Sequence, residues 1–289
     1  MSWMMDERTG QKELSTSFRN QMKNKELMRL VGAHHGLSGI IAKDVGFNSL
    51  YLSGGALSAS KGLPDIGLMT HEELVHKSEE IIDATNLPLL VDIDTGYGEA
   101  FNVARLARDL VKVRVAAVQI EDQVFPKKCG HLDGKQLTAK EEVGEKIRLM
   151  KQAEPDLVIV ARTDALAVTG REDAIDRAKY YMEAGADAIF PEAVRTDEEM
   201  KYFASRLDVP LLFNMTEFGK TPYKTAEEIA ALGFSMVIYP VTSLRVAAKA
   251  VERVYRTIYE KGTQQSMLED MQTRKELYQA IDYEKYDEL

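Results

Sequence analysis

The only cysteine of this 289-residue chain, Cys129, lies in a short motif that could carry acid–base chemistry. Lys127 and Lys128 precede the thiol, and Gly130 and His131 follow it. Nearby positive charge helps a thiol to ionise or to give up a proton near neutral pH. A lone cysteine more often serves as a small buried hydrophobe. The cationic, glycine-containing flanks favour a reactive thiol instead.

Two aspartates, Asp92 and Asp94, form the clearest candidate metal site. They follow an apolar run, and their oxygens can approach one hard cation such as Mg²⁺. Glu121 ends the next apolar run and could orient a metal-bound water. A helix N-cap with a solvated turn is the alternative interpretation, and the spacing alone leaves both open.

Several further residues could bind the anionic groups of a substrate. Ser53, Gly54 and Gly55 follow an apolar run and can offer consecutive backbone N–H groups, although a flexible turn explains them equally well. Arg162 is suited to bidentate recognition of a carboxylate. A salt bridge between Arg162 and Asp164 is the alternative.

A second carboxylate could be held near Asn214 and Thr216 on one side and Arg245 on the other. The histidine pair His34-His35, and likewise His71, lacks a metal-ligand spacing, so we interpret these side chains as structural or solvated.

Short apolar runs alternate with helical patterns along the chain, as expected for buried parallel strands joined by helices. Eight such runs predict a (β/α)8 TIM barrel. An open doubly wound sheet has the same alternation, but no Gly-x-Gly-x-x-Gly motif follows the first run. The predicted strands are residues 28–32, 49–52, 88–91, 116–120, 157–161, 188–190, 210–213 and 236–239.

The remaining segments complete a single barrel domain, residues 1–289. Residues 11–26 predict an N-terminal helix, and the long connections 54–70 and 122–138 are expected to be functional lids. A helical, aromatic-rich tail of about residues 264–289 follows the eighth helix. A barrel does not need this tail, so we expect it to cover a neighbouring subunit.

Composition narrows the classes of function. Hydrophobic residues make up 45% of the chain and charged residues 29%, which is typical of a folded globular protein. A net charge of -9 argues against nonspecific binding to nucleic acid or anionic membranes. One cysteine excludes an internal disulfide framework and fits a reducing, cytoplasmic environment. No apolar run approaches the length of a membrane span, and residues 1–11 do not resemble a signal peptide.

Lys-Lys-Cys-Gly-His resembles the signature of the isocitrate lyase and 2-methylisocitrate lyase family, and the resemblance to 2-methylisocitrate lyase covers nearly the whole chain. The ordered set is specific, although each piece alone is not. The matching motifs are Tyr51-Leu52-Ser53-Gly54, Gly62-Leu63-Pro64-Asp65, Val91-Asp92-Ile93-Asp94-Thr95-Gly96, Lys127-Lys128-Cys129-Gly130-His131, Ala161-Arg162-Thr163-Asp164, Phe190-Pro191-Glu192, Asn214-Met215-Thr216-Glu217, Tyr239-Pro240-Val241-Thr242-Ser243-Leu244-Arg245 and Met271-Gln272-Thr273-Arg274.

The resemblance implies a Mg²⁺-dependent barrel, with Mn²⁺ as a possible substitute, that splits 2-methylisocitrate into pyruvate and succinate. It also implies a homotetramer in which the last helix swaps onto a partner subunit. The implied metal ligands are Asp92 and Asp94, with Glu121 in support. The implied catalytic groups are Cys129 as general acid, Arg162 on the reacting oxygens, and Tyr51 as a candidate base. The implied substrate-binding residues are Ser53, Gly54, Gly55, Gly130, His131, Arg162, Glu192, Asn214, Thr216, Arg245 and Arg274, with Phe190 and Pro240 around the methyl group.

Other activities of the superfamily remain as alternatives. Phosphoenolpyruvate mutases and oxaloacetate decarboxylases resemble this barrel but lack the cysteine motif. Isocitrate lyases share the motif but are usually much longer. A noncatalytic barrel that binds carboxylates is a third hypothesis, and the intact acid, metal and arginine positions argue against it.

Overall fold

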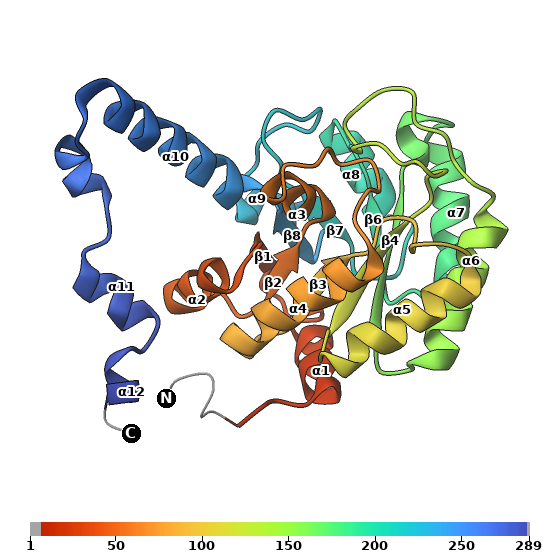
Figure 1. The fold of residues 1–289 in the computed structure, drawn as a ribbon. Helices are drawn as coiled ribbons and strands as arrows, with labels where there is room; N and C mark the ends of the chain where they lie inside the picture. The colour runs from red at the N-terminus through yellow and green to blue at the C-terminus, as the bar shows by residue number, and fades with distance from the viewer. Residues whose placement is uncertain (1–6, 288–289) are drawn as a thin grey trace.

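Eight parallel strands form the centre of the fold, and helices surround them (Figure 1). The structure is a computed structural model, and it describes residues 7–287. The strands are β1 (Met28–Gly32), β2 (Leu50–Leu52), β3 (Leu89–Asp92), β4 (Ala117–Glu121), β5 (Val158–Thr163), β6 (Ala188–Pro191), β7 (Leu212–Asn214) and β8 (Met236–Tyr239).

The hydrogen-bonded order β6-β5-β4-β3-β2-β1-β8-β7 shows that the sheet is a barrel. β1 pairs in parallel with both β2 and β8, and an isolated parallel bridge between Ile189 and Leu211 joins the two remaining edges. The predicted (β/α)8 barrel is therefore confirmed, and the open doubly wound sheet is excluded.

The helices alternate with the strands much as the apolar periodicity predicts. Their bounds are α1 (Gln11–Met22), α2 (Gly36–Val45), α3 (Gly54–Ser60), α4 (His71–Thr85), α5 (Ala100–Lys112), α6 (Lys140–Ala153), α7 (Arg171–Ala184), α8 (Asp197–Ala204), α9 (Ala226–Ala231), α10 (Thr242–Lys261), α11 (Arg274–Ala280) and α12 (Glu284–Asp287), with the short 3-10 helices η1 (Ala165–Ala167) and η2 (Gln265–Asp270).

Two predicted segments differ from the structure. α1 ends at Met22 rather than at residue 26, because the polar residues that follow have no apolar face to bury and instead turn into β1. The connection 54–70 begins with α3, since Ser53 caps this helix by accepting a hydrogen bond from the Ala56 N–H at 3.3 Å.

The N-terminal helix α1 covers the end of the barrel where the strands begin. Leu14, Phe18 and Met22 are buried against the core, and the Ser15 hydroxyl donates to the Ala116 carbonyl at 2.8 Å, just before β4. The apolar face of α1 therefore closes this end of the barrel. The opposite end, where the strands run into the βα loops, is where TIM barrels carry their active sites.

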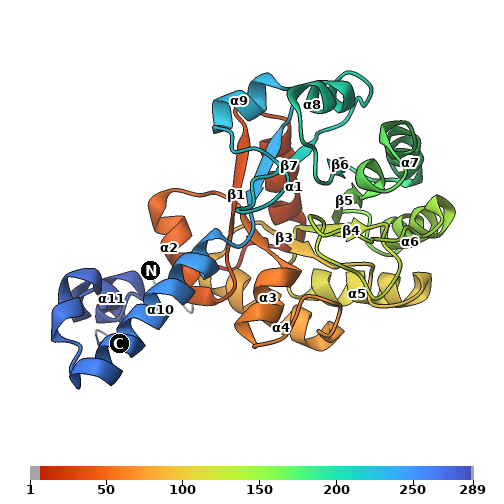
Figure 2. The same cartoon turned by 90° about the horizontal axis from the view of Figure 1, so that it is seen from above.

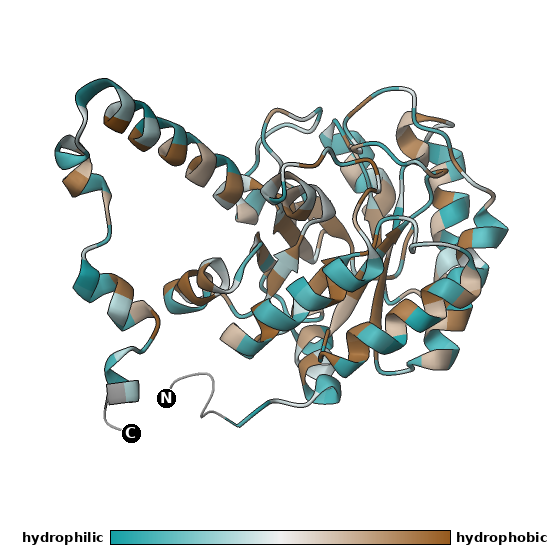
Figure 3. Ribbon diagram, viewed as in Figure 1, coloured by the Kyte–Doolittle hydropathy of each residue, from teal (hydrophilic) through white to brown (hydrophobic). Residues whose placement is uncertain are grey.

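The C-terminal part of the chain extends away from the barrel. α10 projects outward, and α11 and α12 lie at the side of the molecule (Figures 1 and 2). None of the 20 residues of α10 is buried, although apolar positions recur along it (Figure 3). The predicted helical tail is present, and an uncovered apolar stripe on a helix normally requires a partner. Among residues 7–287, no helix is long and apolar enough to span a membrane.

Candidate active site

A cavity of about 330 Å³ lies at the end of the barrel where the strands terminate. Its walls come from β2, β3, β5, β6 and β7 and from the loops that follow β4 and β8. The predicted methyl-pocket residues Phe190 and Pro240 line it as well. The predicted site residues in its lining are Tyr51, Ser53, Gly55, Asp92, Cys129, Gly130, His131, Arg162, Glu192, Asn214, Thr216 and Arg245.

A larger cavity of about 560 Å³ lies beside the first, between the starts of α5 and α6. It shares Asp94 with the metal candidate and contains Tyr97, Phe125 and Lys146. Neither Cys129 nor Arg162 lines it. We therefore take the smaller cavity as the candidate active site, because Cys129 and Arg162 both line it.

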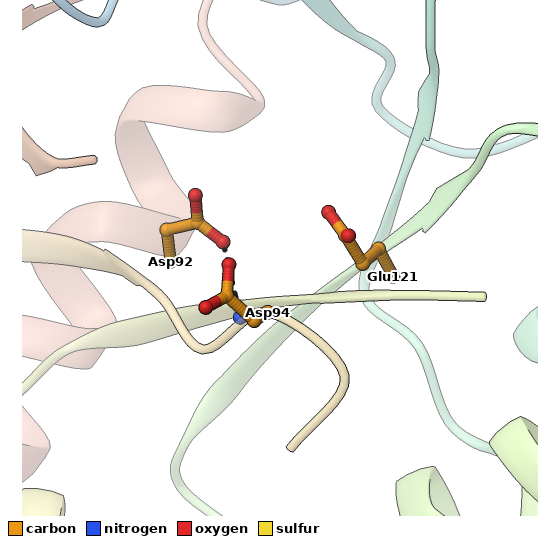
Figure 4. Close-up of side chains that lie close together, drawn as sticks. All are labelled: Asp92, Asp94 and Glu121. Atoms are coloured by element: carbon orange, nitrogen blue, oxygen red, sulfur yellow. Dashed lines mark hydrogen bonds between the residues drawn. The ribbon is translucent and has the colours of Figure 1, made fainter. Parts of the chain in front are cut away.

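Three buried carboxylates, Asp92, Asp94 and Glu121, converge next to this cavity (Figure 4). One oxygen of each lies within 4.8 Å of the others. β3 ends at Asp92, and β4 ends at Glu121, so adjacent strands supply two of the three groups. Asp94 follows in a turn at φ 47, where its own N–H donates to the Asp92 carboxylate at 3.2 Å.

The carboxylate cluster carries an electrostatic cost. Burial, and then the charge of Asp92, raises the pKa of Asp94 to about 6. Burial also raises the pKa of Glu121 well above its usual value. Lys127 offsets part of this cost, because its ammonium contacts Asp65 and lies 2.8 Å from Asp94 Oδ1.

The donor set fits a hard divalent cation. Within the described chain, neither oxygen of Glu121 makes a hydrogen bond of good geometry, although Arg162 Nη1 lies 3.2 Å from Oε2. Carboxylate oxygens are the ligands that Mg²⁺ prefers, together with water and substrate oxygens. A cation among Asp92, Asp94 and Glu121 would offset the repulsion from Asp92 that helps to raise the pKa of Asp94.

Tyr51 is connected to the carboxylate cluster through Gln119. The Tyr51 hydroxyl donates to Gln119 Oε1 at 2.7 Å, and Gln119 Nε2 donates to Asp92 Oδ1 at 3.2 Å. Burial, and then the charge of Asp92, holds the pKa of Tyr51 well above its usual value. In this structure the phenol keeps its proton and donates a hydrogen bond to Gln119.

Arg162 lies at the centre of a second charged cluster. Its guanidinium donates to Asp164 at 2.9 and 3.2 Å and lies 3.5 Å from Glu192. Burial opposes its charge, but Asp164, Glu121 and Glu192 together raise the pKa of Arg162. Arg162 thus makes the salt bridge to Asp164 that was one alternative, and it also lines the cavity.

The Cys129 thiol is exposed and faces the cavity. The lysines before it are occupied elsewhere: Lys127 binds Asp65 and Asp94, and Lys128 donates to the Gly134 carbonyl at 3.0 Å. The two cations expected to act on the thiol therefore hold its loop in place. Any side chain at residue 130 would lie within 2.6 Å of a Glu192 carbon, so glycine is required there for close approach.

His131 joins the Cys129 loop to two other parts of the site. Its Nδ1 accepts a hydrogen bond from the Lys220 N–H at 3.0 Å, so Nε2 carries the proton and faces Glu192 Oε1 at 3.1 Å. Asn214 also reaches Glu192, at 3.4 Å, and its Oδ1 has no hydrogen-bond partner among the described residues. Burial opposes ionisation of Glu192, but the charge of Arg162 and then the hydrogen bond from His131 lower the pKa of Glu192 to about 2.

The remaining predicted site residues differ in how they lie relative to the cavity. The Gly54 N–H donates to Asp92 at 3.2 Å, whereas Gly55 and Thr216 reach the cavity wall. Arg245 lines the cavity but is paired with Glu217 at 2.7 Å.

Arg274 does not join the other predicted residues in this chain. It is exposed at the start of α11, which lies beside α2 rather than over the barrel mouth (Figure 1). The three histidines are elsewhere: His34 is buried, His35 caps α2, and His71 faces Asp109 at 3.1 Å.

Sequence reasoning gave no role to Gln119 or Lys135, and it used Asp65 only as part of a motif. The sequence does contain a signal that could have identified Gln119 as a site residue. Gln119 is a polar residue in a buried run, two positions before Glu121 and on the same face of β4. Lys135 has no such signal, since its carboxylate partner, Asp164, lies just after the next strand, 29 residues further along the chain.

Comparisons with known proteins show the family of the chain. A family model described as phosphoenolpyruvate phosphomutase matches residues 18–259. The 2-methylisocitrate lyases of Halalkalibacterium halodurans and Bacillus subtilis are 54% and 53% identical over 289 residues, which covers 100% of this chain and 96% of each relative.

Solved structures share the fold at lower identity. A 2,3-dimethylmalate lyase matches with a TM-score of 0.89 and 32% identity, covering 95% of this chain and 93% of that one. An oxaloacetate acetylhydrolase with a bound inhibitor matches with a TM-score of 0.90 and 30% identity over 96% of both chains. A phosphonopyruvate hydrolase in complex with oxalate and Mg²⁺ gives a TM-score of 0.86 and 29% identity, covering 96% of this chain and 97% of that one.

Proposed function

The chain belongs to the phosphoenolpyruvate phosphomutase family, and from this premise we propose that it is a carbon–carbon lyase that cleaves 2-methylisocitrate into pyruvate and succinate. This reaction serves the methylcitrate cycle of propionate breakdown. One observation carries the proposal: the Cys129 thiol lines the same cavity as Asp92 and Arg162. The curated relatives at 54% and 53% identity bear the name of this activity.

The reaction needs two proton movements. The tertiary hydroxyl of the substrate gives its proton to a base, which passes it to solvent; the adjacent carbon–carbon bond breaks, and pyruvate leaves with a new carbonyl. The electron pair of that bond stays on the carbon that becomes part of succinate, and this carbon must be protonated. We assign the second proton to Cys129, because its thiol is exposed to the cavity and a positioned general acid speeds such a step.

A divalent cation, for which we propose Mg²⁺ with Mn²⁺ as a substitute, would lower the cost of forming the negatively charged substrate oxygen. Asp92 and Asp94 would hold it, with Glu121 in support. The Tyr51 hydroxyl lines the cavity, and it would have to turn away from Gln119 to donate toward the reacting oxygens.

The carboxylates of the substrate would be bound by polar groups on the cavity wall. Arg162 would stabilise charge that develops on the reacting oxygens. Ser53, Gly54 and Gly55 would bind the pyruvate-forming half. The succinate-forming half would be held by Gly130, His131, Glu192, Asn214, Thr216 and Arg245.

We also propose that the protein works as a homotetramer in which the C-terminal helices swap onto a partner. α10 has no buried residue in this chain, which supports a partner over its apolar face. Arg274 could then serve a neighbouring subunit, since in its own chain it lies away from the cavity. The proposed location is the cytoplasm, where a lone exposed thiol stays reduced.

Product analysis tests the activity. The purified protein is incubated with 2-methylisocitrate, isocitrate and oxaloacetate, each with and without Mg²⁺. We expect stoichiometric pyruvate and succinate from 2-methylisocitrate in the presence of Mg²⁺. Turnover of oxaloacetate alone would reject the proposal in favour of another activity of the family.

A further inference from the structure

Lys135 is a buried cation in the loop that carries Cys129. Only 7% of its surface is exposed. Its ammonium donates to the Gly130 carbonyl and to Asp164 Oδ1, the latter at 2.6 Å. Burying an ammonium is costly unless it is paired and hydrogen-bonded, so this position of Lys135 depends on both partners.

The carboxylate that receives Lys135 also holds Arg162. Asp164 Oδ1 accepts from Arg162 Nη2 at 3.2 Å, and Oδ2 accepts from Nε at 2.9 Å. The Asp164 backbone is itself fixed, because its N–H donates to Asp122 at 2.9 Å. A single immobile carboxylate therefore sets the positions of two cations, one on the Cys129 loop and one on β5.

The loop backbone lies directly on the Arg162 side chain. A Cβ atom at residue 130 would collide with Arg162 Nη2 and would lie 2.6 Å from a Glu192 carbon. The Gly130 carbonyl is the group that Lys135 binds, and Gly130 is the residue next to Cys129. The hydrogen bond from Lys135 thus fixes the backbone from which the thiol projects, relative to the guanidinium across the cavity.

From this geometry we infer that Lys135 is a positioning residue, which binds the Gly130 carbonyl and Asp164 together and so holds the Cys129 thiol on one face of the reacting carbon. This inference rests on the proposed lyase function. The carbon–carbon bond breaks, its electron pair remains on the succinate carbon, and that pair takes the thiol proton; solvent then reprotonates the thiolate. If Lys135 did not hold the loop, water would reach the same carbon from more than one side.

The test uses the stereochemistry of protonation. In D₂O the unaltered protein should give succinate with one deuterium in a single configuration, read by NMR of a chiral derivative. Lys135→Met should give a mixture of both configurations. Its kcat should fall about 100-fold, since a misplacement of about 1 Å can cost that much. KM should change by less than about threefold, because the substrate-binding groups remain.

Lys151→Met is the matched control. Lys151 also donates to one carbonyl, that of Leu157 at 2.6 Å, and to one carboxylate, that of Asp187 at 2.5 Å. These contacts lie at the start of β5, at the end of the barrel away from the cavity. Loss of this partly buried lysine should lower stability and leave the configuration of the product unchanged.

A second variant keeps the test decisive if Lys135→Met does not fold. Lys135→Gln retains a donor with shorter reach and should also give mixed configurations. The inference would be overturned if the Lys135 variants gave deuterated succinate of a single configuration with a kcat equal to that of Lys151→Met. It would also be overturned if both Lys135 variants failed to fold while Lys151→Met folded, because Lys135 would then serve folding alone. Failure of the unaltered protein to cleave 2-methylisocitrate would instead reject the proposed function.

Discussion

Cys129 is the residue whose replacement should most directly report on the chemistry. Cys129→Ser keeps the size of the side chain but substitutes a much weaker acid. We expect kcat to fall by at least about 100-fold, because a positioned general acid contributes roughly 100- to 10,000-fold. Substrate affinity should change little, since the lost interaction belongs to the transition state. Calorimetric binding and single-turnover cleavage separate the two effects, and an unchanged cleavage rate would refute the assigned role.

Glu192 should affect stability in a defined range of pH. Its folded-state pKa of about 2 lies below its usual value of 4.5, because Arg162 and His131 favour the carboxylate despite burial. Its contribution is therefore complete above about pH 4.5 and is lost as the pH falls toward 2. Glu192→Gln should cost about 3 kcal/mol at pH 7. Urea unfolding of both proteins should show a constant difference from pH 8 to 5 that shrinks at lower pH. A difference that instead grew in acid would contradict the assignment.

At the scale of single elements, α10 presents an apolar stripe that its own chain leaves uncovered. Val251, Val254, Tyr255 and Ile258 recur at helical spacing, and Tyr255 is 68% exposed. Tyr255→Glu should shift the protein to a smaller assembly in light scattering, because a charge would be buried at the interface. Glu260→Lys, on the other face of the same helix, is the control. A monomeric mass for the unaltered protein at micromolar concentration would rule out the proposed tetramer.

The strands were the most predictable elements. The apolar runs 28–32 and 236–239 have the same bounds as β1 and β8, and the other strand boundaries differ by one or two residues. Buried parallel strands are apolar on both faces, so composition alone marks them. α3 was missed, since it is a seven-residue helix within a segment that had the composition of a loop.

The polar ends of the strands could be predicted, but most of their partners could not. Most of the predicted site residues line one cavity because parallel strands bring their C-terminal ends together. The pair of Arg162 with Asp164 was one sequence interpretation, whereas the contacts of Arg162 with Glu121 and Glu192 depend on side-chain directions across β4, β5 and β6, which no spacing encodes. The need for glycine at position 130 could not be predicted either, because it arises where the loop backbone lies on Arg162 and Glu192.

At the scale of the whole molecule, the distribution of charge predicts that the stability of the protein should depend on a divalent cation. The chain carries a net charge of -9, and three of its carboxylates are buried together at the mouth of the barrel. Repulsion and burial raise the pKa of Asp94 to about 6, so the folded state pays for this cluster unless a cation neutralises it. A ligand that binds only the folded state stabilises it by mass action.

Mg²⁺ should therefore raise the melting temperature as well as support turnover. At about 100 times its Kd, a ligand specific to the folded state contributes about 2.7 kcal/mol. Exhaustive chelation should abolish cleavage of 2-methylisocitrate, and added Mg²⁺ should restore it. Asp94→Asn should remain folded, lose most activity, and gain much less thermal stability from Mg²⁺ than the unaltered protein. Full turnover after chelation would show that the reaction does not need the cation. An equal gain in melting temperature for Asp94→Asn would show that the cation binds elsewhere.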